Sequence, residues 1–130
     1  IIVTATPSRK PMIMKEWVKP GTHFSCTGSD MEGKQEIDPE ILASARLVAD
    51  DINQSVNVGE FEKGIKEGII SKEDIICEIG DVISGRKKGR MSEEEITVFD
   101  STGLGLQDIA VGYMAVKKAG LMDDIKKMNF

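Results

Sequence analysis

Four short apolar runs predict the strands of this chain. Each run is followed by polar or glycine residues and is rich in β-branched or aromatic side chains, as strands are. Because the runs are continuous rather than alternating, we expect strands that are buried on both faces, as in a parallel sheet. The four runs span residues 1–4, 22–27, 47–50 and 96–99.

The segments between these runs carry helix signals. Asp38 can accept hydrogen bonds from free N–H groups as an N-cap, and Pro39 fits the first helical position. Ile37 and Leu42 have the spacing of a hydrophobic staple across this start. A capping-box-like pattern at 71–74 predicts that a second helix begins at the apolar pair that follows it.

The last third of the chain favours helices. Glycines interrupt residues 54–90 repeatedly, which predicts short helices and turns. Apolar residues then recur every three or four positions over 103–118 and predict a long helix capped by Ser101 or Thr102. Residues 121–128 are a candidate for one more short helix. The apolar face of the long helix consists of Leu106, Ile109, Ala110, Tyr113 and Met114.

The order of these elements is that of an α/β protein. We interpret it as the second half of a Rossmann-type doubly wound parallel sheet, followed by a C-terminal helix. In such a sheet the carboxyl ends of all strands lie on the same edge. Thr6, Asp30 and Ser101 each follow a predicted strand, so we expect them to line one crevice although they lie far apart in the chain.

Asp30 is the residue with the clearest chemical meaning. It follows the 22–27 run and lies between Gly28 and Gly33, which allow sharp turns and the close approach of a ligand, while Lys34 adds a positive charge. A carboxylate there can act as a general acid and base if burial raises its pKa. The alternative is a strand-ending turn with a helix-capping acid.

Other candidates also have two interpretations. Residues 4–8 either offer hydroxyls and a backbone made rigid by Pro7 to a ribose or nicotinamide, or form a plain turn. Ser101 and Thr102 either precede free N–H groups that face a ligand or are ordinary N-caps. His23 is the one histidine and has no second ligand at metal spacing, so we predict no metal site and a hydrogen-bonded histidine in the sheet.

Composition argues against several partners. The chain has 17 basic and 22 acidic residues and a formal net charge of −5, which argues against nucleic acid, and the basic cluster at 86–90 is expected to be a solvated loop. No apolar run reaches the length of about 18 residues that a membrane span needs. Cys26 and Cys77 form neither a disulfide framework nor a metal site, and we expect buried reduced thiols in a cytoplasmic protein.

Several motifs occur in a fixed order along the chain. They are Thr-Ala-Thr-Pro-Ser-Arg-Lys-Pro at 4–11, Trp-Val-Lys-Pro-Gly-Thr-His at 17–23, Gly-Ser-Asp at 28–30, Gly-Lys-Gln-Glu at 33–36, Asp-Asp at 50–51, Gly-Glu at 59–60, Ile-Gly-Asp-Val at 79–82 and Val-Phe-Asp-Ser-Thr-Gly at 98–103. This ordered set resembles the ornithine cyclodeaminase/μ-crystallin family, and most of all its archaeal-type alanine dehydrogenase branch. Glu32 stands where that family often has proline, and residues 24–26 read Phe-Ser-Cys where it usually has Ile-Asn-Ala.

The resemblance implies an oxidoreductase that uses NAD, with NADP as the alternative, and acts on a small α-amino acid or its imine. The closest branch implies reversible oxidative deamination of L-alanine to pyruvate and ammonia. Other branches cyclise ornithine to proline or reduce cyclic ketimines, and the family also contains a lens crystallin, which implies a non-enzymatic binding protein as the alternative. The resemblance further implies a homodimer.

The resemblance also implies roles for individual residues. Asp30 corresponds to the acid/base residue, Lys34 to a residue that contacts the nucleotide, and Thr102 to a residue near the substrate. The residues expected at the cofactor are Thr4, Thr6, Thr27, Gly28, Ser29, Asp30, Lys34 and Ser101.

The glycine-rich turn that binds the pyrophosphate in a dinucleotide-binding fold does not occur in this sequence. Residues 103–105 begin a G-x-G-x-x-G pattern, but Asp108 occupies the position of the third glycine. We therefore interpret the chain as the carboxy-terminal part of a longer enzyme. Residues 1–100 would be half of a dinucleotide-binding domain, and residues 101–130 would lead to an absent N-terminal substrate domain. By itself the chain is expected to be inactive.

Overall fold

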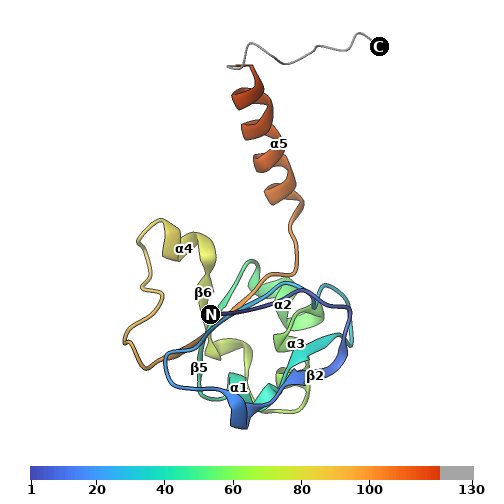
Figure 1. Cartoon of the computed structure of the whole chain (residues 1–130), viewed down its shortest axis with the longest axis vertical. Helices are drawn as coiled ribbons and strands as arrows, with labels where there is room; N and C mark the ends of the chain where they lie inside the picture. The colour runs from blue at the N-terminus through green and yellow to red at the C-terminus, as the bar shows by residue number, and fades with distance from the viewer. Residues whose placement is uncertain (121–130) are drawn as a thin grey trace.

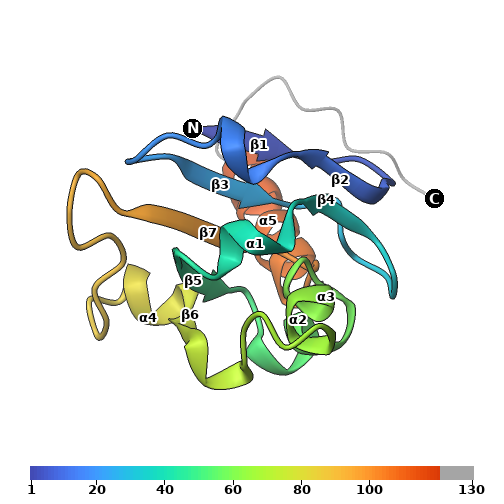
Figure 2. The same cartoon turned by 90° about the horizontal axis from the view of Figure 1, so that it is seen from below.

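A parallel sheet forms the centre of the structure, a computed structural model that describes residues 1–120. In spatial order its strands are β1 (Ile2–Thr4), β3 (His23–Cys26), β7 (Ile96–Asp100), β5 (Ala45–Ala49) and β6 (Ile75–Glu78). Every neighbouring pair is parallel (Figure 2). The predicted α/β class is therefore confirmed, and the helix predicted over 121–128 lies outside the described residues.

The four predicted strands are confirmed as β1, β3, β5 and β7. β7 is the last strand in the sequence, yet it lies in the middle of the sheet, between β3 and β5. Its last residue, Asp100, lies beside Cys26 on one side and Ala49 on the other. The polar residues that follow β7 therefore emerge at the centre of the sheet edge.

The helix predicted to begin after the capping-box-like pattern is wrong. The pattern is real, because the Asp74 carboxylate accepts the Ser71 N–H at 2.7 Å and the Ser71 hydroxyl at 2.9 Å. It caps only the short 3-10 helix η2 (Lys72–Asp74), and β6 begins at the next residue, Ile75. The buried Ile75 and Cys77 pair with β5. Tertiary pairing of an apolar, β-branched run has overridden the local helix signal.

A second small sheet was not predicted. β2 (Arg9–Ile13) and β4 (Gln35–Ile37) run parallel, with Arg9 beside Gln35 and Ile13 beside Ile37. β2 contains Pro11, which has no N–H to donate and for that reason favours an edge position. Every residue of β4 is buried, so this short strand is part of the interior although its sequence is polar.

Short helices occupy the segments where they were expected. Asp38 caps α1 (Pro39–Leu42), because its carboxylate accepts the Glu40 N–H at 3.0 Å, and this predicted start is confirmed. α2 (Ile52–Val58), α3 (Phe61–Lys66) and α4 (Ile79–Ile83) follow. Apart from β6, the prediction of short helices and turns over 54–90 is therefore confirmed, and the basic cluster at 86–90 is a largely exposed loop.

One face of the sheet packs against α1 and α3 to form the core. Phe24, Leu47 and Val98 from adjacent strands meet Ile41 of α1 and Phe61 of α3 in one cluster, and each is at most 1% exposed. The same interior contains the thiol of Cys26, and that of Cys77 is also buried; both are free, as predicted. The core positions the strands whose ends form the candidate site.

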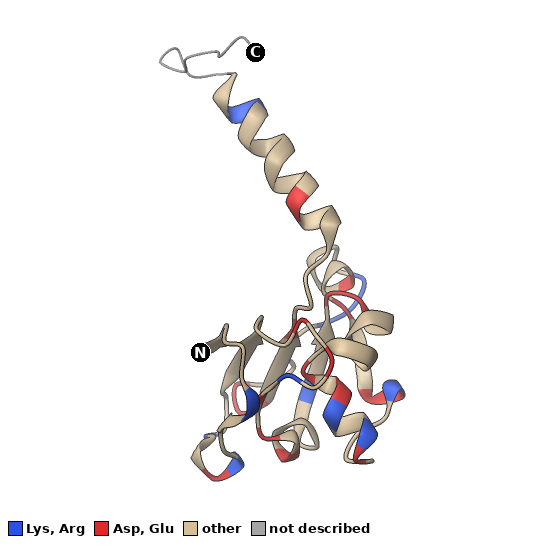
Figure 3. Cartoon of the chain, turned by 90° about the vertical axis from the view of Figure 1, so that its right-hand side faces the viewer, with Lys and Arg blue, Asp and Glu red and all other residues tan. Residues whose placement is uncertain are grey.

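The final helix α5 (Gly105–Ala119) projects away from the sheet (Figure 1). It carries few charges, in contrast to the mixed charges of the sheet body (Figure 3). Its predicted apolar face is exposed, with Leu106, Ile109, Tyr113 and Met114 between 68% and 72% exposed. The predicted cap is wrong, because Leu104 is the N-cap. Among the described residues no helix is long and apolar enough to cross a membrane.

Truncating the core should destabilise the chain much more than truncating the open edge of the sheet. Leu47 is 1% exposed and Val3 is 67% exposed. We expect Leu47→Ala to lower the free energy of unfolding by about 2–5 kcal/mol, because it removes buried methyl groups and leaves a cavity. Val3→Ala should change it by less than about 0.5 kcal/mol. Urea denaturation of both variants checks this, and equal losses would contradict the assignment of the core.

Candidate functional site

The loops that follow β1, β3 and β7 leave the same edge of the sheet, because these strands are parallel neighbours. Their backbones are joined there. The Thr27 N–H and hydroxyl both donate to the Thr4 carbonyl at 2.9 Å, and the Ser101 N–H donates to the Cys26 carbonyl at 2.8 Å. The prediction that the three segments share one edge is confirmed, and a crevice lined by all of them stays a prediction.

Asp30 lies in the loop after β3, but its surroundings differ from those expected. Its side chain is 53% exposed, and it forms an ion pair with Lys34, whose side chain is only 14% exposed. The hydrogen bond from Lys34 lowers the pKa of Asp30 below its usual value. The expectation of a poorly exposed carboxyl with a raised pKa is therefore wrong for this structure: Asp30 is an ionised, accessible carboxylate.

Glu36 joins the Thr6 segment to the glycine that precedes Asp30. Its carboxylate accepts the Thr6 N–H at 2.6 Å, the Thr6 hydroxyl at 2.8 Å and the Gly28 N–H at 3.0 Å. Glu36 is fully buried, whereas Thr6 is half-buried. The sequence analysis did not identify Glu36 as a site residue, although it belongs to the Gly-Lys-Gln-Glu motif.

Ser29 is turned into the protein rather than toward a ligand. It is 1% exposed, and its hydroxyl donates to the Glu60 carboxylate at 2.5 Å. Glu60 begins α3, is fully buried and also accepts the backbone N–H groups of Glu36 and Ile37. Burial raises the pKa of Glu60, and these hydrogen bonds oppose that rise. A direct contact of the Ser29 hydroxyl with a cofactor does not agree with this burial.

Ser101 and Thr102 hold the segment that leads to α5. Asp50, at the end of β5, accepts the Ser101 hydroxyl at 3.2 Å, the Thr102 N–H at 2.8 Å, the Thr102 hydroxyl at 2.9 Å and the Gly103 N–H at 3.0 Å. Thr102 is 5% exposed and Ser101 is half-buried. The predicted capping role of both residues is thus replaced by attachment to Asp50.

Thr4 supports the edge from beneath. Thr4 is 5% exposed, whereas Thr6 is half-buried. Of these two threonines, only Thr6 is accessible. Thr27 and Asp30 are exposed as well. The structure therefore divides the predicted residues into an accessible set and a buried set. The accessible or half-buried residues are Thr6, Thr27, Asp30, Lys34 and Ser101, and the buried residues are Thr4, Gly28, Ser29 and Thr102.

Asp100 is a buried carboxyl group that the sequence analysis also did not identify. It is fully buried, and among the described residues neither of its oxygens has a hydrogen-bond partner of good geometry. Burial, together with the charges of Glu60 and Asp50, raises its pKa to about 8, while the nearby Ser55 hydroxyl and Glu60 N–H lower it. Asp100 is thus protonated at neutral pH.

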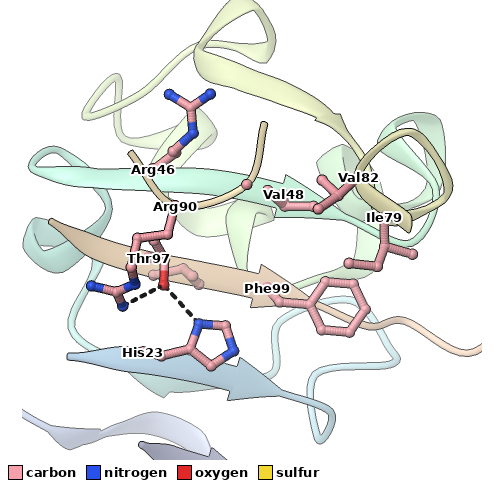
Figure 4. Close-up of a pocket in the computed structure, with 10 residues that line it drawn as sticks. His23, Arg46, Val48, Ile79, Val82, Arg90, Thr97 and Phe99 are labelled. Carbon is pink, nitrogen blue, oxygen red and sulfur yellow. Dashed lines mark hydrogen bonds between the residues drawn. The ribbon is translucent and has the colours of Figure 1, made fainter. Parts of the chain in front are cut away.

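A cavity of about 210 Å³ lies on the opposite face of the sheet, where α4 covers β5 and β7 (Figure 4). His23 lines it, and a ring nitrogen shares a hydrogen bond with the Thr97 hydroxyl at 2.7 Å. Burial and the charge of Arg90 lower the pKa of His23. His23 is therefore the hydrogen-bonded sheet histidine that was predicted. The apolar wall of the cavity consists of Val48, Ile79, Val82 and Phe99.

Among residues 1–120, no three His, Cys, Asp or Glu side chains are grouped so that they could hold a metal ion. The buried acids instead receive N–H and O–H donors, as described above for Glu36, Glu60 and Asp50. What the edge offers a ligand is one accessible carboxylate, one lysine, two half-buried hydroxyls and the exposed Thr27. That donor set suits a polar organic molecule.

Residues 1–120 match the ornithine cyclodeaminase/mu-crystallin family, and the chain belongs to it, as the motifs indicated. An alanine dehydrogenase of Archaeoglobus fulgidus is 50% identical over 119 residues, which is 92% of this chain and 37% of that protein. An iminosuccinate reductase of Paracoccus denitrificans is 44% identical over 119 residues, with the same coverage of both chains. The chain thus spans well under half the length of these relatives.

Solved structures have the same fold. An archaeal alanine dehydrogenase dimer with bound NAD superposes with a TM-score of 0.87 and 48% identity, covering 98% of this chain and 40% of that chain. A Δ1-pyrroline-2-carboxylate reductase of Thermococcus litoralis, in complex with NADH and L-proline, gives a TM-score of 0.84 and 32% identity, covering 90% of this chain and 36% of that chain. These likenesses extend over nearly the whole described fold.

The raised pKa of Asp100 predicts that stability falls as pH rises. Its pKa is about 8 when folded, against an ordinary value near 3.8. Below pH 4 Asp100 is protonated in both the folded and the unfolded chain, and its contribution to stability is fully present. Between pH 4 and 8 the folded chain keeps a proton that the unfolded chain has released. The free energy of unfolding should therefore fall by up to about 1.4 kcal/mol per pH unit.

Urea denaturation at pH 5, 6.5 and 8 measures this slope. Asp100→Asn, which removes the titrating proton, should flatten it, and the slope that remains would come from other acids such as Glu60. Val3→Ala should leave the slope of the wild type unchanged. An Asp100→Asn variant with the wild-type slope would show that Asp100 is ionised in the folded protein.

Proposed function

We propose that this chain is part of an NAD-dependent oxidoreductase that acts on a small α-amino acid or the corresponding imine. The observation that carries the proposal is the shared sheet edge, which the loops after β1, β3 and β7 leave together with the accessible hydroxyl of Thr6, the ionised carboxylate of Asp30 and the accessible hydroxyl of Ser101. Its support is the family membership, together with relatives named as alanine dehydrogenase, iminosuccinate reductase and Δ1-pyrroline-2-carboxylate reductase. All three names denote chemistry at a carbon–nitrogen bond.

The accessible hydroxyls fit the nicotinamide and ribose end of NAD. The Thr6 hydroxyl donates its proton to Glu36, and the Ser101 hydroxyl donates to Asp50. The Thr6 hydroxyl also accepts the Ser8 N–H at 3.3 Å. Each hydroxyl therefore keeps at least one lone pair, which suits the amide and hydroxyl donors of that part of the cofactor. Thr27 and Lys34 would complete the contact. Gly28 lets the backbone come close, while Thr4 and Ser29 support the edge from within.

NAD, when bound, supplies the hydride acceptor. For oxidation, the ammonium group of the substrate must first lose a proton, and the Cα–H electron pair then leaves as hydride while the C=N bond forms. Water adds to that bond and ammonia departs, which leaves the keto acid. We propose that Asp30 takes this proton and holds the attacking water, because it is ionised and accessible, although the hydrogen bond from Lys34 lowers its pKa and makes it a weaker base. Thr102 is the residue that the family resemblance implies near the substrate, although it is 5% exposed in this chain.

We propose L-alanine as the substrate, converted reversibly to pyruvate and ammonia. The alanine dehydrogenase relative has the highest identity among the three relatives named above. Iminosuccinate and cyclic imines are the competing substrates, and ornithine cyclisation is a further alternative. We also infer a homodimer, on the likeness to an alanine dehydrogenase dimer, and a cytoplasmic protein, on the two buried free thiols.

Replacing Asp30 should remove turnover and keep cofactor binding. In the full-length protein we expect Asp30→Asn to lower kcat by about 100- to 10,000-fold, the usual loss for one general acid/base. The Kd for NAD should change little. Steady-state kinetics with L-alanine, iminosuccinate and a cyclic imine measure both the loss and the substrate, and fluorescence titration gives the Kd.

Glu40→Gln, at an exposed position on α1, is the matched control and should behave as the wild type. A near-normal kcat in Asp30→Asn would remove Asp30 from the chemistry. Tight NAD binding without turnover of any of these substrates by the wild type would favour a non-enzymatic binding protein.

The 130-residue chain produced alone should bind NAD and NADP weakly or not at all. The pyrophosphate normally lies on a glycine-rich turn at a helix N-terminus, which supplies oriented N–H donors, and this sequence encodes no such turn. The exposed apolar face of α5 should also cause self-association. Titration calorimetry and light scattering test both expectations, and micromolar binding by a monomer would contradict them.

A further inference from the structure

Two buried carboxylates, Glu36 and Glu60, hold the loop that carries Asp30. Both are fully buried, and neither is exposed to a ligand. Each is surrounded by hydrogen-bond donors from segments that are distant in sequence. Burying a carboxylate is costly unless such donors surround it. These hydrogen bonds join segments of the chain that are distant in sequence, so the two acids fix how those segments lie relative to one another.

Glu36 is a bridge between two loops of the candidate site. One oxygen accepts both donors of Thr6, and the other accepts the N–H of Gly28. Two of these three donors are backbone N–H groups, which can only donate. Both oxygens of residue 36 must therefore be acceptors, a condition that a carboxylate meets and an amide does not.

Gly28 is the residue that this bridge requires. A Cβ at position 28 would lie 2.5 Å from a Glu36 oxygen and 2.5 Å from the backbone N and O of Thr6. Only a glycine allows the two backbones and the carboxylate to come this close. The glycine before Asp30 thus serves the contact with Glu36, and that contact fixes where the next residues of the loop begin.

Glu60 anchors the other side of the loop. It accepts the Ser29 hydroxyl, and it also accepts the backbone N–H groups of Glu36 and Ile37 and the amide of Gln35. It therefore joins the residue before Asp30 to the strand that carries Glu36. The loop then turns on itself, since the Asp30 N–H donates to the Gly28 carbonyl at 3.1 Å.

We propose that Glu36 is a positioning residue, which sets Asp30 and Thr6 in the places where they meet the cofactor and substrate, with Glu60 as its anchor. The proposal rests on the function proposed above. Glu36 touches no reacting atom; it acts by fixing the separation of the two loops. A misplacement of a reacting group by about 1 Å can cost about 100-fold in rate.

The two acids differ in a way that provides a matched test. In Glu36→Gln, either orientation of the amide sets its NH2 group against a backbone N–H, of Thr6 or of Gly28. In Glu60→Gln, the NH2 group can take the place of the oxygen that Ser29 contacts, because the Ser29 hydroxyl accepts as readily as it donates. That oxygen also lies 3.1 Å from the Glu36 N, but the Glu36 N–H keeps the other Glu60 oxygen at 3.0 Å as its acceptor. The same chemical change should therefore disrupt the loop at position 36 and be tolerated at position 60.

The experiment compares Glu36→Gln, Glu60→Gln and the exposed control Glu40→Gln in the full-length protein. The measurements are kcat per NAD-binding site, KM, Kd for NAD, Tm, and amide hydrogen exchange of residues 27–34. We expect Glu36→Gln to lower kcat by about 10- to 100-fold and to speed exchange of this segment. Glu60→Gln should change kcat by less than about 3-fold, and Glu40→Gln should match the wild type.

Several results would overturn the proposal. A Glu36→Gln variant with normal kcat per binding site and a lower Tm would show a role in stability alone. Equal effects at positions 36 and 60 would refute the argument from donor polarity. If Glu36→Gln does not fold, Glu36→Asp replaces it, because aspartate keeps two acceptor oxygens on a shorter side chain. Unchanged kcat per site in that variant refutes the proposal.

The exchange measurement separates this proposal from the proposed function. If the wild type turns over none of the tested substrates, the proposed function fails. Faster exchange of residues 27–34 in Glu36→Gln, beside unchanged exchange in Glu40→Gln, would still support the role of Glu36 in shaping the loop. Unchanged exchange in both variants would refute it whatever the activity.

Discussion

The insertion of β7 between β3 and β5 is the contact on which the rest of the structure depends. β7 is hydrogen-bonded along its whole length to both neighbours, in register from Ile96 to Asp100 against β5. Because all three strands are parallel, this insertion brings the residues after β7 next to those after β3 and β5. Without it, Asp50 would have no donors from 101–103, and α5 would have no fixed starting point.

The loops at this sheet edge explain why the candidate site is rich in buried acids. Loops at a sheet edge contain backbone N–H groups that no strand partner satisfies, and such groups need acceptors when they are buried. Glu36 accepts donors from the loops after β1 and β3, Glu60 from the loop after β3 and from β4, and Asp50 from the segment after β7. Asp100 is the exception, since it is buried without a hydrogen-bond partner of good geometry among residues 1–120, and burial raises its pKa to about 8. The edge is therefore shaped by acids within the protein and by hydroxyls at its surface.

Sequence pattern predicted the strands well, because continuous apolar runs have few other stable placements. It failed at β6, where a genuine local cap was outweighed by pairing with β5, and at β4, whose polar residues are buried by long-range contacts. It identified Asp30 from its place after a strand. It overlooked Glu36 and Glu60, because an acid in a polar segment is normally solvated and only the tertiary fold shows that these two, in β4 and at the N-cap of α3, are buried.

The acids at this edge divide between two tasks that need opposite surroundings. Asp30 is accessible and ionised, because Lys34 pairs with it and lowers its pKa. Glu36 and Glu60 are excluded from solvent, and their oxygens are occupied by donors that belong to the loops. An exposed carboxylate on a glycine-rich loop that nothing anchors would populate several rotamers and backbone conformations. In the role proposed above, the buried pair restricts the backbone of this loop, while Lys34 pairs with the Asp30 side chain.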